Sequence, residues 1–349
     1  MTRRTLAGLI AVPLLLVLSF AAVLLPVPYV TYSPGLTVDV LASQKGEEIV
    51  QVTGRRTYRT DGELRMTTVY VTQPDGRVGL LDAMGAWLDD ERAIYPHDAV
   101  YPSGETAEQS QTESAIEMVS SQDAATAVAL TELGYDIEPV VEVLNVTKGL
   151  PADGKLKVRD VFLEVNGVTI TSAEQVAKEI QKVKKGDSVK FLVQRGGKEV
   201  DVAVTPQLVD GALRVGVTPG PGYTFPFQVS VNIPENIGGP SAGLMFSLAI
   251  YDTLTPGSLT GGAIVAGTGT IDTTGKVGPI GGIQQKVVAA NRSGAELFLV
   301  PKANCADALN APNDTGMRLV KATTMHEARE AIADWVKDPD APLPSCEVN

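Results

Sequence analysis

The longest apolar run of the 349-residue chain lies near its start. Residues 5–30 carry no charge, follow Arg3 and Arg4, and precede the next basic residue, Lys45. About 20 apolar residues suffice to cross a bilayer, and basic residues favour its cytoplasmic side. The pattern predicts a single-pass cell-membrane protein with a cytoplasmic N-terminus and an extracytoplasmic body. The alternative is a cleaved signal peptide, because residues 19–21 have the small-residue spacing of a processing site, although the apolar run continues beyond them.

After this run, the polar and apolar pattern divides the chain into successive units. Residues 31–104 alternate as strands do, and residues 105–133 predict a helix that ends at Gly134. Residues 138–206 predict strands around one helix, and strands alternate with helices from about residue 222 onward. The predicted organisation is an N-terminus and anchor (1–30), a β-rich extracytoplasmic segment (31–104), a helical connector (105–134), a β-rich domain (135–208), an α/β domain (209–340) and a tail (341–349).

Composition and motifs exclude several classes of partner and cofactor. The chain has 29 basic and 41 acidic residues and a net charge of -12, without a basic cluster, so we expect no nucleic-acid partner. Residues 269–277 are the nearest approach to a phosphate-binding loop, but the spacing and the final valine are wrong, so we expect no nucleotide. Cys305 and Cys346 can form a disulfide in an exported chain or remain free thiols, and they do not suffice for a zinc site. We therefore expect no cofactor and no metal.

A lone hydroxyl group follows a Gly-Gly-Pro turn. Gly238 and Gly239 allow a close backbone approach, and Pro240 suits the first position of a helix. This pattern predicts Ser241 in the first helical turn, where free N–H groups can stabilise a developing anion. We expect those donors to come from the glycine turn and from Ser241 or Ala242. The alternative is that the serine only helps to cap a core helix.

A second candidate group lies on the apolar face of a later helix. The spacing of residues 283–290 predicts a helix on which Lys286 shares a stripe with apolar side chains. Burial disfavours a charged ammonium group, and a neutral lysine can accept a serine's proton. The alternative is a lysine whose ammonium group reaches water. His97 and His326 are the only histidines, and their surroundings do not favour a Ser-His-Asp arrangement.

These two motifs, Pro-Ser-Ala-Gly and Gly-Gly-x-x-x-Lys, stand in the order and context seen in one protease family. Residues 222–337 resemble the proteolytic domain of the Lon family. The resemblance implies that Ser241 is the nucleophile, that Lys286 is the general base and that Thr268 orients the lysine amine. The chain departs from many Lon enzymes at Gly238, where they have an acidic residue.

The preceding β-rich block resembles a bacterial PDZ domain. Residues 138–206 contain the turn, the Arg-Asp pair and the Asn-Gly pair of that family, and Arg159 replaces the more usual glycine. The resemblance implies binding of extended peptides by strand addition. Leu133, Gly134 and Tyr135 form the candidate peptide-binding loop. The alternative is a domain that serves only in packing.

Taken together, the anchor, the PDZ-like domain and the Lon-like domain resemble bacterial membrane-anchored Lon-like proteases. The expected fold class is α+β, with an N-terminal transmembrane helix, a PDZ-like β-rich domain and a Lon-type α/β proteolytic domain. The resemblance implies an ATP-independent serine endopeptidase that cleaves unfolded or extended polypeptides and assembles as a homo-oligomer, a hexameric ring. The alternatives are a catalytically idle membrane-tethered peptide-binding scaffold and a structural envelope protein.

Overall fold

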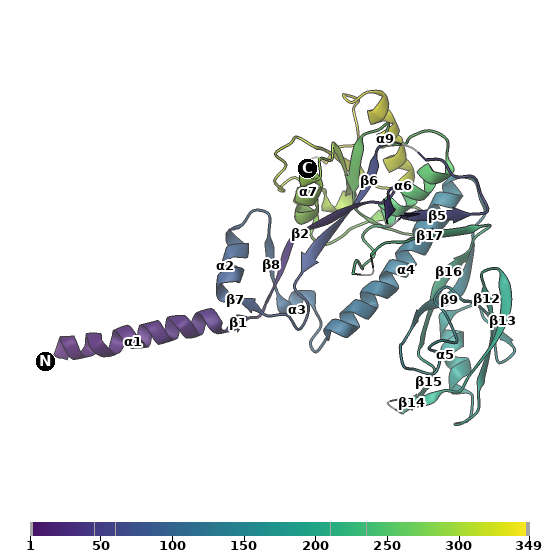
Figure 1. Cartoon of the computed structure of the whole chain (residues 1–349), viewed down its shortest axis with the longest axis horizontal. Helices are drawn as coiled ribbons and strands as arrows, with labels where there is room; N and C mark the ends of the chain where they lie inside the picture. The colour runs from purple at the N-terminus through teal and green to yellow at the C-terminus, as the bar shows by residue number, and fades with distance from the viewer. Residues whose placement is uncertain (1–2, 45, 60, 210, 235, 347–349) are drawn as a thin grey trace.

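The computed structural model describes residues 3–44, 46–59, 61–209, 211–234 and 236–346 (Figure 1). Its first element, helix α1 (Arg3–Leu24), extends away from the rest of the molecule. The apolar run of residues 5–30 is not one element, because α1 ends at Leu24 and strand β1 (Pro26–Val27) follows. Within these described ranges, no helix combines the length and the apolar character that crossing a bilayer requires. The predicted transmembrane helix, and the single-pass membrane protein inferred from it, are therefore wrong.

A six-stranded mixed sheet forms the centre of the larger part of the molecule. Its four parallel strands are extended by two antiparallel strands from the N-terminal part of the chain. Residues of the predicted 31–104 segment thus belong to the same sheet as residues beyond 260. The strand order is β22 (Arg318–Ala322), β21 (Leu297–Pro301), β18 (Ile264–Gly267), β6 (Glu63–Val71), β2 (Tyr29–Asp39) and β8 (Ala93–Pro96).

Helices cover both faces of this sheet. Alternate residues of the buried strand β21 pack to opposite sides, since successive strand residues point to opposite faces. Leu297 and Leu299 belong to the core cluster of α6 (Gly243–Leu254) and α9 (Met325–Lys337). Phe298 and Val300 belong to the cluster on the side of α7 (Ile283–Arg292). Both α6 and α7 contact β6, so the sheet fixes their separation.

A second, smaller domain of residues 138–224, called the small domain below, has its own sheet and core (Figure 1). Its strand order is β13 (Lys198–Val204), β12 (Val189–Arg195), β10 (Val161–Val165), β9 (Glu138–Val146) and β16 (Val217–Thr224). Helix α5 (Ala173–Gln181) contacts the edge strand β16. Its capping box at Ser172 and Gln175 fixes where the helix begins.

Helix α4 (Ala107–Glu132) connects the two parts. It contacts α6 in the large part and both β9 and β16 in the small domain. Thr106 and Gln109 cap its start reciprocally, which fixes its first turn. The remaining elements are short: β3 (Ser43–Gln44), β4 (Glu47–Glu48), β5 (Val50–Thr53), β7 (Val78–Gly79), α2 (Leu80–Leu88), α3 (His97–Val100), β11 (Val168–Thr169), β14 (Gln207–Val209), β15 (Ala212–Arg214), β17 (Gln228–Val231), β19 (Thr270–Ile271), β20 (Val277–Gly278), η1 (Lys302–Asn304) and α8 (Cys305–Ala308).

Candidate active site

The turn that carries Ser241 is held against helix α4. Gly239 adopts a left-handed conformation (φ 86°), which glycine tolerates without strain, and its N–H donates to the carbonyl of Ser114 at 3.0 Å. The hydroxyl of Ser121 donates to the carbonyl of Pro240 at 3.0 Å. Helix α6 begins only at Gly243, so Ser241 lies just before the helix. The prediction that Ser241 lies in the first helical turn is therefore wrong.

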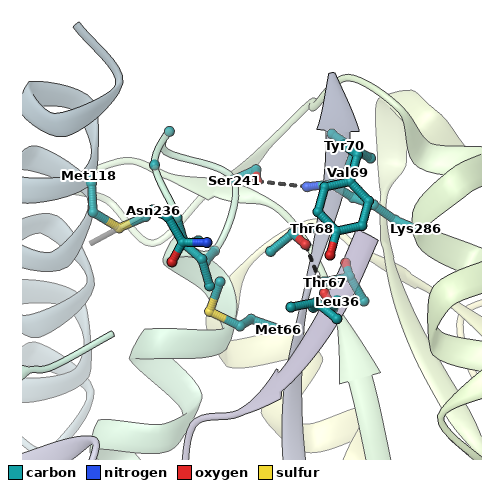
Figure 2. Close-up of a pocket in the computed structure, with 14 residues that line it drawn as sticks. Leu36, Met66, Thr67, Thr68, Val69, Tyr70, Met118, Asn236, Ser241 and Lys286 are labelled. Atoms are coloured by element: carbon teal, nitrogen blue, oxygen red, sulfur yellow. Dashed lines mark hydrogen bonds between the residues drawn. The ribbon is translucent and has the colours of Figure 1, made fainter. Parts of the chain in front are cut away.

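Lys286 lies on α7 and reaches the serine through the interior. Its side chain is among the largest that are fully buried, with 2% of the residue exposed. Its Nζ atom lies 2.7 Å from Ser241 Oγ (Figure 2). The same atom lies 3.0 Å from Thr268 Oγ1. The structure therefore brings together all three residues to which the Lon resemblance assigns the chemistry.

Burial sets the protonation of this amine. Desolvation lowers the pKa of Lys286 from 10.5 to about 7, because the charged form has lost its hydration. In the described part of the chain, no carboxylate forms an ion pair with Lys286. At neutral pH a substantial fraction of the amine is therefore uncharged and has a lone pair.

Thr268 directs that lone pair. Its hydroxyl donates to the backbone carbonyl of Ser241 at 3.0 Å, so its oxygen accepts an N–H from Lys286. The N–H of Gly269 donates to the same Ser241 carbonyl at 2.8 Å and fixes the serine backbone. With one amine hydrogen bonded to Thr268, the lone pair of a neutral Lys286 is free to accept the serine proton.

The oxyanion donors differ in part from those that the sequence suggested. The N–H of Gly239 is occupied by Ser114, and Pro240 has no N–H. Among the described hydrogen bonds, the N–H groups of Gly238, Ser241 and Ala242 have no acceptor, so they can face a developing oxyanion. A Cβ atom at position 238 would lie 2.8 Å from the Cβ of Ser114, so this close packing requires glycine.

A pocket of about 140 Å³ opens beside Ser241 and Lys286 (Figure 2). Its far wall comes from β2 and β6, to which the sequence assigned no chemistry. Thr67 on β6 is buried, and its hydroxyl donates to the carbonyl of Gly267 at 3.2 Å, which joins this wall to the Thr268 segment. Alternation predicted the strand but not its position, because strand pairing is non-local. The wall and rim consist of Leu36, Met66, Thr67, Thr68, Val69, Tyr70, Met118, Asn236 and Ile237.

Other predicted site residues lie elsewhere. Leu133 caps the C-terminus of α4, and the ring of Tyr135 packs on Phe227 with centroids 5.5 Å apart. Leu133, Gly134 and Tyr135 do not line the Ser241 pocket. In the described residues, no group of three or more His, Cys, Asp or Glu side chains is arranged to hold a metal ion.

The two cysteines form a disulfide in the structure. Cys305 at the start of α8 is bonded to Cys346, and both are buried in the cluster on the α7 side of the sheet. The bond ties the C-terminal segment to the large part of the molecule. Neither cysteine lines the Ser241 pocket, so the bond's role is structural.

Comparison with known families agrees with this geometry. Residues 227–333 match the Lon protease (S16) C-terminal proteolytic domain, and residues 116–205 match the PDZ domain. These matches confirm the Lon and PDZ resemblances predicted from the sequence.

Individual relatives share the same region. The Lon protease of Roseiflexus castenholzii is 42% identical over 95 residues, which is 26% of this chain and 12% of that protein. The Lon protease of Haemophilus influenzae is 36% identical over 95 residues, again 26% and 12%. The chain thus spans only about an eighth of the length of these relatives. The PDZ domain of the SdrC-like protein Lin2157 from Listeria innocua is 29% identical, with coverage of 22% of this chain and 90% of that one and a TM-score of 0.21.

Proposed function

We propose that this protein is a serine endopeptidase that hydrolyses unfolded or extended polypeptides without ATP, with Ser241 as nucleophile and Lys286 as general base. The observation that carries the proposal is the 2.7 Å separation of Lys286 Nζ and Ser241 Oγ. The amine is buried and has a depressed pKa, so it is a base at neutral pH. A lysine with only a packing role has no need of a hydroxyl partner at the mouth of a pocket.

The proposed reaction proceeds through an acyl-enzyme. Neutral Lys286 accepts the hydroxyl proton of Ser241 as Oγ attacks the peptide carbonyl carbon. The tetrahedral oxyanion is bound by the free N–H groups of Ser241 and Ala242. As it collapses, the carbon–nitrogen bond breaks, and the leaving amine takes the proton from Lys286. Water then attacks the ester carbonyl while Lys286 accepts its proton. The bond between the acyl carbon and Ser241 Oγ breaks, and Lys286 returns the proton to Oγ, which releases a carboxylic acid product and regenerates Ser241 and neutral Lys286.

The substrate class follows from size and from access. A pocket of about 140 Å³ accommodates one side chain rather than a folded surface, so the cleaved chain must reach Ser241 in an extended form. The sequence contains no phosphate-binding loop that would supply an unfolding motor. By analogy with Lon proteases, we also propose assembly as a hexameric homo-oligomer.

The small domain is proposed to regulate cleavage or to recognise peptides. Strand β16 pairs with β9 on one side, and its other edge lies beside α5, where an added peptide strand would bind. Pro219 and Pro221 lie two residues apart and lack N–H donors. Because proline in a sheet places its missing donor at a free edge, this edge offers few donors to a peptide. This favours regulation over tight capture of peptides.

Cleavage of unfolded, fluorescently labelled casein by the full chain tests the proposal. Wild type should release fluorescence without ATP, whereas Ser241→Ala and Lys286→Ala should reduce the rate by at least about a thousandfold, as for other catalytic dyads and triads. Lys276→Ala, which removes an exposed lysine, is the matched control and should retain activity. If wild type is as inert as both site variants, the alternative of a catalytically idle peptide-binding scaffold gains support.

A further inference from the structure

Three consecutive residues of α4 contact three separate parts of the molecule. The hydroxyl of Ser121 donates to the carbonyl of Pro240 in the nucleophile turn at 3.0 Å. The amide of Gln122 donates to the carbonyl of Val231 on β17 at 3.1 Å. Gln122 and Asp123 in turn accept hydrogen bonds from one side chain of the small domain. This stretch of α4 therefore touches both the site and the small domain.

That side chain is Arg159. Its Nη2 atom donates to Gln122 Oε1 and its Nε atom to Asp123 Oδ1, both at 2.9 Å. The guanidinium fork thus grips two neighbouring residues of α4 at once, which a single ammonium group cannot reproduce. The backbone N–H of Arg159 donates to the carbonyl of Val143 on β9 at 2.8 Å. This bond fixes the backbone of Arg159 to the sheet of the small domain.

The residue that makes this contact, Arg159, has a strained backbone conformation. Its φ is 68°, and among the described non-glycine residues only Asn166 shares a positive φ. Asparagine tolerates this conformation comparatively well, whereas a long side chain does not. A glycine would adopt this conformation without strain, so the contacts of the arginine side chain must offset the cost of its backbone conformation. Strain at a non-glycine residue is a reason to look for function.

The surroundings of Arg159 make the contact specific. Asp123 and Glu142 are each 3% exposed and face each other across the junction of α4 and β9. Burial, and then the neighbouring Asp123, raise the pKa of Glu142, so the pair holds a proton and one negative charge. Arg159 supplies the balancing positive charge. A Cβ atom at Gly222 would overlap the Glu142 carboxyl group, so the opposing strand also leaves room for this cluster.

We infer that Arg159 is a positioning residue for Ser241, which fixes the nucleophile turn through residues 121–123 of α4. The inference rests on the proposed peptidase function. Docking of the small domain sets the position of α4 through Gln122 and Asp123. Helix α4 then holds the turn through the bond from Ser121 to Pro240 and the bond from Gly239 to Ser114. The small domain is thereby required for the geometry of the serine as well as for any peptide binding.

Arg159→Gly tests the inference, because it removes the grip and relieves the backbone strain. In the full chain, kcat per active site should fall about tenfold, since small misplacements of reacting groups have effects of this size, with KM within about twofold. The pH midpoint of kcat should not move, because Lys286 is untouched. Arg159→Lys should restore only part of the rate. Lys182→Gln, which breaks the Lys182–Glu179 ion pair inside the small domain, is the matched control and should leave kcat unchanged.

A double variant separates positioning from general destabilisation. Ser121→Ala should lower kcat like Arg159→Gly, and combining the two should have little further effect, because both interrupt one connection. Unchanged kcat in Arg159→Gly, an equal loss in Lys182→Gln, or fully multiplicative effects in the double variant would overturn the inference. Hydrogen exchange over residues 236–246 gives a readout without catalysis, and Arg159→Gly should accelerate it. Wild type that lacks Ser241-dependent activity refutes the proposed function, whereas unchanged exchange in Arg159→Gly refutes the positioning role.

Discussion

Replacing Lys286 by methionine should abolish proteolysis and, at neutral pH, stabilise the fold. Methionine is of similar length and fills the buried site without a charge. Burial lowers the pKa of Lys286 from 10.5 to about 7. Between these values the unfolded chain binds a proton at Lys286 that the folded chain does not, so the contribution of Lys286 to wild-type stability rises with pH across this window. The methionine variant lacks this dependence.

The magnitude follows from the same pKa. One pKa unit corresponds to about 1.4 kcal/mol, so the full displacement corresponds to about 5 kcal/mol. The variant loses the hydrogen bonds from Lys286 to Ser241 and Thr268, each worth about 1 kcal/mol. We expect Lys286→Met to be more stable than wild type by about 2 kcal/mol at pH 7, and the advantage to vanish near pH 9.

Urea unfolding followed by tryptophan fluorescence measures this difference. The chain has two tryptophans, and Trp335 on α9 is buried in the core at 7% exposure, so its emission reports unfolding. The control is Lys276→Met, a substitution at an exposed position. Its difference in unfolding free energy from wild type should be the same at pH 7 and pH 9. A methionine variant at 286 that is less stable than wild type at pH 7, or a difference that is equal at pH 7 and pH 9, would refute the reasoning.

Further outcomes are expected for the proposed protease. The kcat for casein should rise with pH and reach half its maximum near 7, the pKa of Lys286, and a profile that is flat from about pH 5.5 to 9 would contradict a lysine base. Thr268→Val removes the hydroxyl that accepts from the amine, so kcat should fall about tenfold or more with little change in KM, as single-turnover assays would show. Burial, and then Asp123, raise the pKa of Glu142 to about 9, so the contribution of Glu142 to stability falls as pH rises from about 5 toward 9, because the unfolded chain releases that proton first. Glu142→Gln should flatten this fall in urea titrations at several pH values, and an unchanged slope would count against a shared proton. Cys346→Ser opens a disulfide with a sequence separation of 41 and should lower the unfolding free energy by about 2–4 kcal/mol without changing kcat, as denaturation and activity assays on one sample would show.

The pairing of serine and lysine was expected from the resemblance to the Lon family, because each local signal alone left an alternative open. The Gly-Gly-Pro sequence defined a tight turn before an apolar helix, and the helical spacing of residues 283–290 placed Lys286 on the buried face. Each signal depends on neighbours within a few residues, and the structure joins the two side chains at 2.7 Å. The start of α6 was misplaced by three residues, because Pro240 belongs to the turn that α4 holds.

Features that depend on distant parts of the chain were not predictable in the same way. The strand pattern of residues 63–71 gave no sign that β6 pairs in parallel with β18 and forms a wall of the pocket. The left-handed conformation and the side-chain contacts of Arg159 could likewise not be predicted from the sequence, since they depend on the placement of α4. The apolar run of residues 5–30 suggested one spanning helix, but its end turns into strands that join β7 and the central sheet.

The pairing of strands β6 and β18 also determines when the proposed active site can form during synthesis of the chain. Glu63 pairs with Ile264, and the side chain of Thr67 bonds to Gly267, 200 positions later in the chain. The small domain, whose strands are close together in sequence, can form as soon as it leaves the ribosome, whereas the central sheet must wait. A nascent chain therefore has an incomplete Ser241–Lys286 site until its last third has emerged.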